Sequence, residues 1–101
     1  MEAINEKPGL SLYSAKNMAK PISFYCGAPD AKSVHLEGDF SSWGPLAMQR
    51  RVDGWWFIQV SLTHGHHQYR FRVDGQPLLD PRAAGVARNK ANEEVSVIAV
   101  S

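Results

Sequence analysis

Apolar and polar residues alternate with a period of two along most of the chain from residue 21 onward. The apolar positions of the first two alternating segments are Ile22, Phe24, Cys26, Val34 and Leu36. Successive side chains of a strand point to opposite faces of a sheet, so this period predicts strands that are buried on one face. We therefore expect two half-buried strands before residue 38.

The next segments carry the turn signals of β-hairpins. Residues 46–50 are expected to form a short strand, and Asp53-Gly54 then supplies a tight turn, because glycine accepts positive φ. In residues 55–62 one face carries Trp56, Ile58, Val60 and Leu62, and the other carries Trp55, Phe57, Gln59 and Ser61. The first set is predicted to lie in the core.

Residues 66–73 follow Gly65 with the same alternation. The inward set is His67, Tyr69, Phe71 and Val73, and the outward set is His66, Gln68, Arg70 and Arg72. If residues 55–62 and 66–73 pair as a hairpin, their outward faces share one side of one sheet. That pairing would bring Trp55 and Phe57 close to Gln68 and Arg70.

The remaining turn signals complete a chain of about seven short strands. Asp74-Gly75 predicts a turn, Leu78-Leu79 a short strand, Asp80-Pro81 its end, and residues 95–100 a closing β-branched strand. No helical period appears, so the pattern predicts an all-β fold, an antiparallel β-sandwich. Residues 1–20 show no strict period and are interpreted as an N-terminal arm, and residues 21–101 as the sandwich domain.

Length and composition place the chain among ordinary globular domains. Its 101 residues suit one domain, and 44% apolar with 21% charged residues excludes disordered and transmembrane classes. The formal charge of +1 predicts binding to neither nucleic acid nor membranes, although residues 46–92 hold seven basic and three acidic residues. We expect an uncharged partner.

The single cysteine, Cys26, excludes an internal disulfide and any zinc site built from several thiolates. It falls on the inward face of its strand. Residues 1–20 lack the continuous apolar run that a secretory signal needs. These two features predict a reducing compartment and a cytoplasmic location.

The residues that could support catalysis do not form a recognisable set. His64, His66 and His67 have no third ligand nearby in the sequence, so we expect no metal site, with His67 packed or hydrogen-bonded and the other two solvated. No Gly-x-Ser-x-Gly elbow is present, and the aspartates occupy turns or strand ends. We expect a protein that is not an enzyme and needs no cofactor.

Trp43 and the outward face of residues 55–72 have a chemistry that suits sugars. Trp43 lies among Ser41, Ser42, Gly44 and Pro45, which are typical of a loop. Sugars present apolar C–H faces and hydroxyl rims, which aromatic rings can stack against and arginine or amide groups can hydrogen-bond. The alternatives are that Trp43 closes one end of the sandwich and that the sheet face is merely solvated.

Several ordered motifs resemble the family-48 carbohydrate-binding modules. They are residues 34–43, Asp53-Gly54-Trp55-Trp56, residues 65–71, Val73-Asp74-Gly75 and Asp80-Pro81. That family includes the glycogen-binding domain of the AMP-activated protein kinase β subunit and the early-set domains of isoamylases and branching enzymes. The resemblance covers about four-fifths of the chain and implies an immunoglobulin-like sandwich that binds α-1,4-glucans such as glycogen and starch.

The resemblance also implies roles for individual residues. Trp43 corresponds to a stacking platform and Arg70 to a basic sugar contact, and Asn89 or Asn92 stands where the family offers an asparagine. With Gln68 and Trp55 from the outward face, these six residues form the predicted carbohydrate site. One departure is Pro77, which stands where kinase-type members carry a second tryptophan.

The departure at Pro77 has a cost that can be estimated. Covering ~100 Å² of one indole face contributes only ~2.5 kcal/mol at about 25 cal/mol per Å². Millimolar affinity requires about 4 kcal/mol. Other contacts must therefore supply the difference, or the fold has been kept without its ligand.

Three hypotheses follow. The first is a non-catalytic α-glucan-binding module that uses Trp43 and Arg70. The second is a protein-interaction domain, in which Trp55 and Phe57 dock a partner or a second copy of the chain as a homodimer. The third is a module that regulates or targets a separate glucan-active enzyme or kinase subunit.

Overall fold

A computed structural model of the protein describes residues 19–101, so the arm expected over residues 1–20 lies almost entirely outside the described residues. In the described part the chain forms nine strands and one 3₁₀ turn. They are β1 (Lys20–Gly27), β2 (Val34–Gly38), η1 (Asp39–Ser41), β3 (Leu46–Ala47), β4 (Gln49–Arg50), β5 (Trp55–Leu62), β6 (Gly65–Val73), β7 (Gln76–Leu78), β8 (Gly85–Arg88) and β9 (Glu94–Val100).

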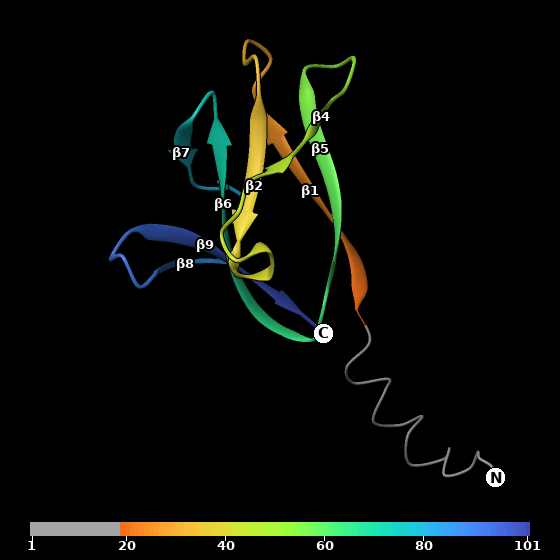
Figure 1. Ribbon diagram of the computed structural model, residues 1–101. Coiled ribbons are helices and arrows are strands. Elements are labelled where there is room, and N and C mark those ends of the chain that lie inside the picture. The colour runs from red at the N-terminus through yellow and green to blue at the C-terminus, as the bar shows by residue number, and fades with distance from the viewer. Residues whose placement is uncertain (1–18) are drawn as a thin grey trace, which may run out of the picture.

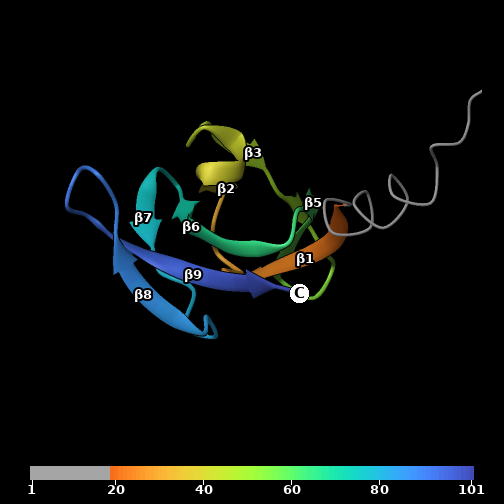
Figure 2. The same cartoon turned by 90° about the horizontal axis from the view of Figure 1, so that it is seen from below.

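The strands form two antiparallel sheets. One has the order β1-β5-β4, and the other has the order β3-β2-β6-β9-β8 with β7 added to β6. Two views show β1 and β5 on one side of the molecule and β6, β8 and β9 on the other (Figures 1 and 2). The predicted antiparallel β-sandwich is therefore confirmed.

The hairpin predicted between β5 and β6 is wrong. β5 pairs with β1 and β4, whereas β6 pairs with β2, β7 and β9. Gly65, at φ 125°, begins β6 where the chain passes from one sheet to the other. Placing the two strands in different sheets lets both of their apolar faces meet across one core, which a shared sheet would not allow.

The strand predicted over residues 46–50 is divided between the sheets. β3 pairs with β2, and β4 pairs with β5. Met48, between them, is buried in the core. The chain thus changes sheets within three residues, and the β4–β5 hairpin turns at Gly54 as predicted, with φ 85°.

β8 was not expected from the sequence. Among residues 19–101 it pairs only with β9 and is an edge strand, and its Val86 is 59% exposed. Its residues have no alternating apolar pattern because neither face contributes a large side chain to the core. This edge strand and the loop that follows it nevertheless form one wall of the site described below.

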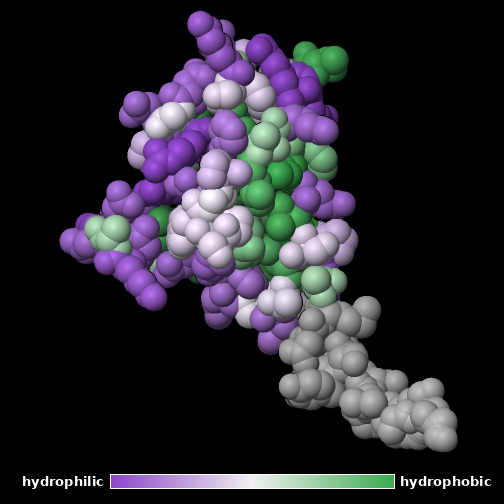
Figure 3. All heavy atoms as spheres, in the orientation of Figure 1, coloured by the Kyte–Doolittle hydropathy of each residue, from purple (hydrophilic) through white to green (hydrophobic). Residues whose placement is uncertain are grey.

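The core lies between the two sheets and is formed mainly by residues predicted to face inward, with Ala31 and Met48 in addition. Phe24, Leu36, Trp56, Tyr69 and Phe71 are all buried. The rings of Phe24 and Tyr69 meet edge to face at 5.0 Å, and Trp56 donates its indole N–H to Ala28 O at 2.9 Å. Figure 3 shows apolar atoms between β2 and β5, whereas hydrophilic atoms cover β7 and the β8–β9 loop.

Two titratable groups are held inside this core. Burial raises the pKa of the Cys26 thiol above its ordinary value, so this cysteine packs as an apolar residue. Burial and the hydrogen bond to Asp80 raise the pKa of Tyr69 well above its ordinary value, with its hydroxyl 2.7 Å from Asp80 Oδ2.

Within residues 19–101 no helix has the length and apolar character that crossing a membrane requires.

Candidate functional site

A groove of about 550 Å³ lies on the outer face of the larger sheet. Its floor comes from β2 and β6, one wall from the loop after η1, and the other wall from the β8–β9 loop. The residues that line it are Glu37, Asp39, Trp43, Gln68, Arg70, Arg72, Asn89, Lys90, Ala91 and Glu93. Its volume falls within the usual range of small-molecule sites.

The Trp43 wall is built by a tight turn at the end of β2. Ser42 and Trp43 both have positive φ, at 53° and 61°, and Trp43 N donates to Gly38 O at 2.8 Å. The Ser41 hydroxyl oxygen lies 2.8 Å from Gly44 O and 3.1 Å from Gly38 O, so its one proton is shared between these two carbonyl oxygens. A bulky residue with positive φ is an uncommon conformation, so these bonds hold Trp43 in a position that the backbone alone would not favour.

Gly38 permits this turn to lie close against β6. A Cβ at this position would lie 2.4 Å from the Phe40 ring and 2.8 Å from Gln68 O. Gly38 is buried and extended, at φ −168°, so space rather than a left-handed conformation requires glycine here.

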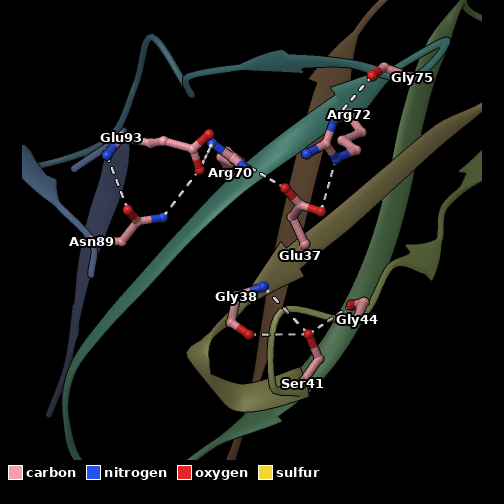
Figure 4. A network of polar contacts seen from close by, with 9 residues as sticks. All are labelled: Glu37, Gly38, Ser41, Gly44, Arg70, Arg72, Gly75, Asn89 and Glu93. Atoms are coloured by element: carbon pink, nitrogen blue, oxygen red, sulfur yellow. Dashed lines mark hydrogen bonds and ion pairs between the residues drawn. The ribbon is translucent and has the colours of Figure 1, made fainter. Parts of the chain in front are cut away.

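Arg70 lies at the centre of the groove floor and is almost fully enclosed by protein. Its Nε donates to Glu37 Oε2 at 2.6 Å, and its Nη1 lies 3.2 Å from Glu93 Oε1 (Figure 4). Its guanidinium lies over the Trp43 ring, with the Cζ atom 6.0 Å from the ring centroid. The hydrogen bond to Glu37 raises the pKa of Arg70 above its ordinary value, so Arg70 stays charged.

Glu37 joins Arg70 to Arg72. Its Oε1 accepts a hydrogen bond from Arg72 Nε at 3.0 Å, and Arg72 Nη1 donates to Gly75 O at 3.0 Å (Figure 4). The Glu37 side chain is only 6% exposed. Because each partner of a buried ion pair leaves an uncompensated charge when the other is removed, this network fixes the floor of the groove.

The opposite wall is held in shape by Asn89. Its Oδ1 accepts the backbone N–H groups of Ala91 and Glu93, at 2.9 and 3.0 Å. Asn89 N donates to Glu93 O at 3.0 Å, and its side-chain amide lies 3.5 Å from Glu93 Oε1. Figure 1 shows this loop projecting from the side of the molecule away from β1 and β5.

Asp39 closes the third side of the groove. Its Oδ2 accepts Gln68 N at 2.9 Å, and its Oδ1 lies 3.2 Å from His67 Nδ1, whose other ring nitrogen is 2.9 Å from Thr63 O. His67 is thus hydrogen-bonded and His64 and His66 are exposed, as predicted. Among the described residues no three His, Cys, Asp or Glu side chains come together as ligands for a metal ion.

The structure brings together four of the six predicted site residues. Trp43, Gln68, Arg70 and Asn89 line the groove. Asn92 does not: it occupies a turn with φ 62°, and its N–H donates to Asn89 O at 2.9 Å.

Trp55 belongs to the other sheet, because β5 does not pair with β6. A Cβ on Gly27 would lie 3.2 Å from its indole, and the Arg82 guanidinium lies 5.2 Å from its ring centroid. Its ring is therefore covered in part by these two residues. It borders a separate hollow of about 280 Å³.

The groove also contains Arg72, which the sequence placed on the outward face, and four residues that the sequence did not single out as sugar contacts: Glu37, Asp39, Lys90 and Glu93. Glu37 is opposite Arg70 in the β2–β6 register, so opposite charges at outward positions were the available signal. That signal needs the strand pairing, which alternation alone does not specify. Pro77 is opposite Arg72 on β7 and borders a smaller hollow beside Arg70 and Glu93.

Comparison with known proteins agrees with the resemblance seen in the sequence. Residues 25–101 match the family described as the glycogen recognition site of AMP-activated protein kinase. The β-1 subunit of 5'-AMP-activated protein kinase is 42% identical over 68 residues in Sus scrofa and over 79 residues in Rattus norvegicus, which is 66% and 77% of this chain. The 1,4-alpha-glucan branching enzyme of Prochlorococcus marinus is 33% identical over 73 residues, 70% of this chain.

These matches cover only parts of the relatives. The chain spans about half of the pig protein, 53%, with 26% of the rat protein and 10% of the branching enzyme. The similarity therefore concerns one module of each relative.

Proposed function

This chain belongs to the family of glycogen-recognition modules of AMP-activated protein kinase, which are non-catalytic, and we propose that its groove binds an α-1,4-glucan between Trp43 and the β8–β9 loop. The observation that carries the proposal is the position of Trp43. Its half-buried indole stands at the edge of a groove whose other walls carry fixed polar side chains.

Trp43 would act as the stacking platform. An indole face packs against the C–H face of a glucose ring, and the Arg70 guanidinium beside the ring fixes its orientation before the sugar arrives. A preorganised side chain loses less entropy on binding. The positive φ of Trp43 supports this role, because backbone strain persists where the surrounding structure enforces it and is concentrated at functional sites.

The charge of the groove suits an uncharged polyol. Arg70, Arg72 and Lys90 balance Glu37, Asp39 and Glu93, so the lining has three charges of each sign. Hydroxyl groups can donate to the carboxylates and accept from the cationic groups, whereas an anionic ligand could bond only to the cationic groups. Polar contacts of this kind would supply the binding energy that one indole face lacks.

The test is electrophoresis in gels that contain glycogen, with hydroxyethylcellulose gels as the control polymer. Glycogen should retard the wild type, and Trp43→Ala should remove most of the retardation, because about 2.5 kcal/mol of apolar contact is lost. Trp55→Ala is the matched control and should migrate as the wild type. Equal retardation of the two variants would contradict the assignment of the groove.

A second candidate function concerns the outer face of the smaller sheet. There Trp55 is 39% exposed, and the rings of Tyr25 and Phe57 lie 5.3 Å apart. An exposed aromatic group of this kind suits the docking of another polypeptide, such as a separate glucan-active enzyme, a kinase subunit or a second copy of the chain. Sedimentation equilibrium tests the last form: concentration-dependent dimers that Trp55→Asp abolishes would support it, and a monomer at all concentrations would exclude it.

The proposed location is the cytoplasm. Cys26, the only cysteine of the chain, is unpaired and buried, which fits a reducing compartment. Fractionation of the cells that make the protein would test this, and recovery outside the cytoplasmic fraction would contradict it.

A further inference from the structure

The polar groups on the groove floor are already bonded to protein. Both oxygens of Glu37 accept from arginines, one from Arg70 and one from Arg72. The Arg70 side chain is 9% exposed and has carboxylates on its Nε and Nη1. A sugar that enters the groove can therefore form few hydrogen bonds with Glu37, and it can use only those Arg70 donors that are not already bonded to carboxylates.

Glu93 differs from these two residues. Its side chain is 53% exposed, and its Oε1 faces both Arg70 Nη1 and the Asn89 amide (Figure 4). Within residues 19–101 its Oε2 has no protein partner. The carboxylate is therefore anchored on one oxygen and has acceptor capacity on the other.

The backbone of Glu93 is also fixed. Its N–H donates to Asn89 Oδ1, and its carbonyl oxygen accepts Asn89 N, both at 3.0 Å. A carboxylate on such a loop is presented to the groove in one place, so a ligand need not order it. Glu93, with its fixed position and free oxygen, lines the same groove as Trp43, and both contact the Arg70 guanidinium.

We infer that the Glu93 carboxylate accepts hydrogen bonds from sugar hydroxyls in this groove and that Arg70 positions Glu93 for this role. The same carboxylate makes the groove select uncharged glucans. The inference rests on the proposed function. Hydrogen bonds to an ionised carboxylate are shorter and stronger than those between neutral groups, so Glu93 compensates for the absent second platform at Pro77.

The selectivity follows from the charge balance of the lining. Replacing Glu93 by a neutral residue leaves two carboxylates against three cationic groups. The groove would then accept a glucan that carries carboxylates more readily, because a like charge at close range has been removed. Glu93 thus favours an uncharged glucan in two ways, by attraction of hydroxyls and by repulsion of anions.

The experiment compares Glu93→Ala and Glu93→Gln with Glu94→Ala by calorimetric titration. Glu94 is the matched control, since it is adjacent, 57% exposed and paired with Arg88 at 3.9 Å rather than with the groove floor. The ligands are maltoheptaose and maltoheptaose oxidised to carboxylates at C6, at low ionic strength, where charge effects are least screened.

Glu93→Ala should weaken maltoheptaose binding about tenfold or more, the size expected for a hydrogen bond to a charged group. Glu93→Gln keeps the size of the side chain and an acceptor oxygen, so it should weaken maltoheptaose binding less than Glu93→Ala does. It should nevertheless narrow the preference for uncharged over oxidised ligand by about fivefold or more. Glu94→Ala should change neither quantity. Unchanged backbone amide spectra would show that the loop has kept its shape in each variant.

The outcomes separate this inference from the proposed function. If maltoheptaose binds the wild type and Trp43→Ala loses it, while both Glu93 variants bind as the wild type, the role of Glu93 is wrong and the glucan groove stands. Tighter maltoheptaose binding by Glu93→Ala would show that Glu93 obstructs the groove, and would also overturn the role. If the wild type binds no glucan, the proposed function and the inference both fail.

Discussion

At the scale of single residues, Gly38 decides whether the Trp43 turn can form. A methyl group there would be within 2.4 Å of the Phe40 ring and 2.8 Å of a backbone oxygen, distances that real structures do not show. Because the obstacle includes backbone, relief requires η1 to move away from β6. Trp43, two residues beyond η1, would move with it.

We therefore expect Gly38→Ala to lower the free energy of unfolding by about 1–3 kcal/mol, as overpacked sites do, and to weaken glycogen binding. Urea denaturation and glycogen gels measure the two effects. The control is Gly85→Ala, where a methyl group would meet no atom of residues 19–101 within 4 Å and φ is not left-handed. A Gly38→Ala protein that is as stable as the control would show that the turn is less closely packed than described.

Trp43, Gln68 and Arg70 could be singled out from the sequence because loop composition and strand alternation are local properties. The acidic side of the groove could not. Glu37 and Glu93 enter it only because β2 pairs with β6 and the β8–β9 loop forms a wall of the groove. Asn89 and Asn92 are three residues apart, and the sequence does not distinguish them. The left-handed turn at Asn92 does.

At the scale of elements, the β8–β9 loop is the part of the groove that depends on one side chain. Asn89 Oδ1 accepts hydrogen bonds from two backbone N–H groups, as a capping residue does. Asn92 occupies a left-handed position that glycine would accept without strain. The two asparagines should therefore respond oppositely to substitution.

Asn89→Ala should destabilise the protein by about 1 kcal/mol, the usual loss of a capping side chain, and weaken glucan binding because Glu93 loses its fixed backbone. Asn92→Gly should leave both quantities within about 0.5 kcal/mol of the wild type. Thermal unfolding and glucan titration measure them. Equal effects of the two substitutions would mean that Asn89 does not organise the loop.

The strands themselves were predictable to different degrees, for physical reasons. The alternation in β1, β2, β5 and β6 gave the inward faces correctly, since each of these strands contributes large side chains to the core. The alternation does not predict which strand pairs with β5, because two consecutive strands can either join one sheet or face each other across the core. β8 carries no core pattern, so only its pairing with β9 defines it.

At the scale of the whole molecule, the sandwich separates two aromatic sites. Trp43 lies over the larger sheet, and Trp55 lies on the outer face of the smaller one. A glucan held in the groove would therefore leave the Trp55 face accessible. The two proposed functions would therefore not compete for one aromatic face.

The most direct measurement is a nuclear magnetic resonance titration that follows the indole N–H signals. The chain has three tryptophans, and the structure places each in a different environment: Trp43 in the groove, Trp55 on the opposite sheet and Trp56 in the core with its N–H bonded to Ala28 O. Maltoheptaose should shift the Trp43 signal saturably and leave the other two in place, and cellohexaose should shift none. A shift confined to Trp55, or no shift at millimolar maltoheptaose, would contradict glucan recognition in this groove.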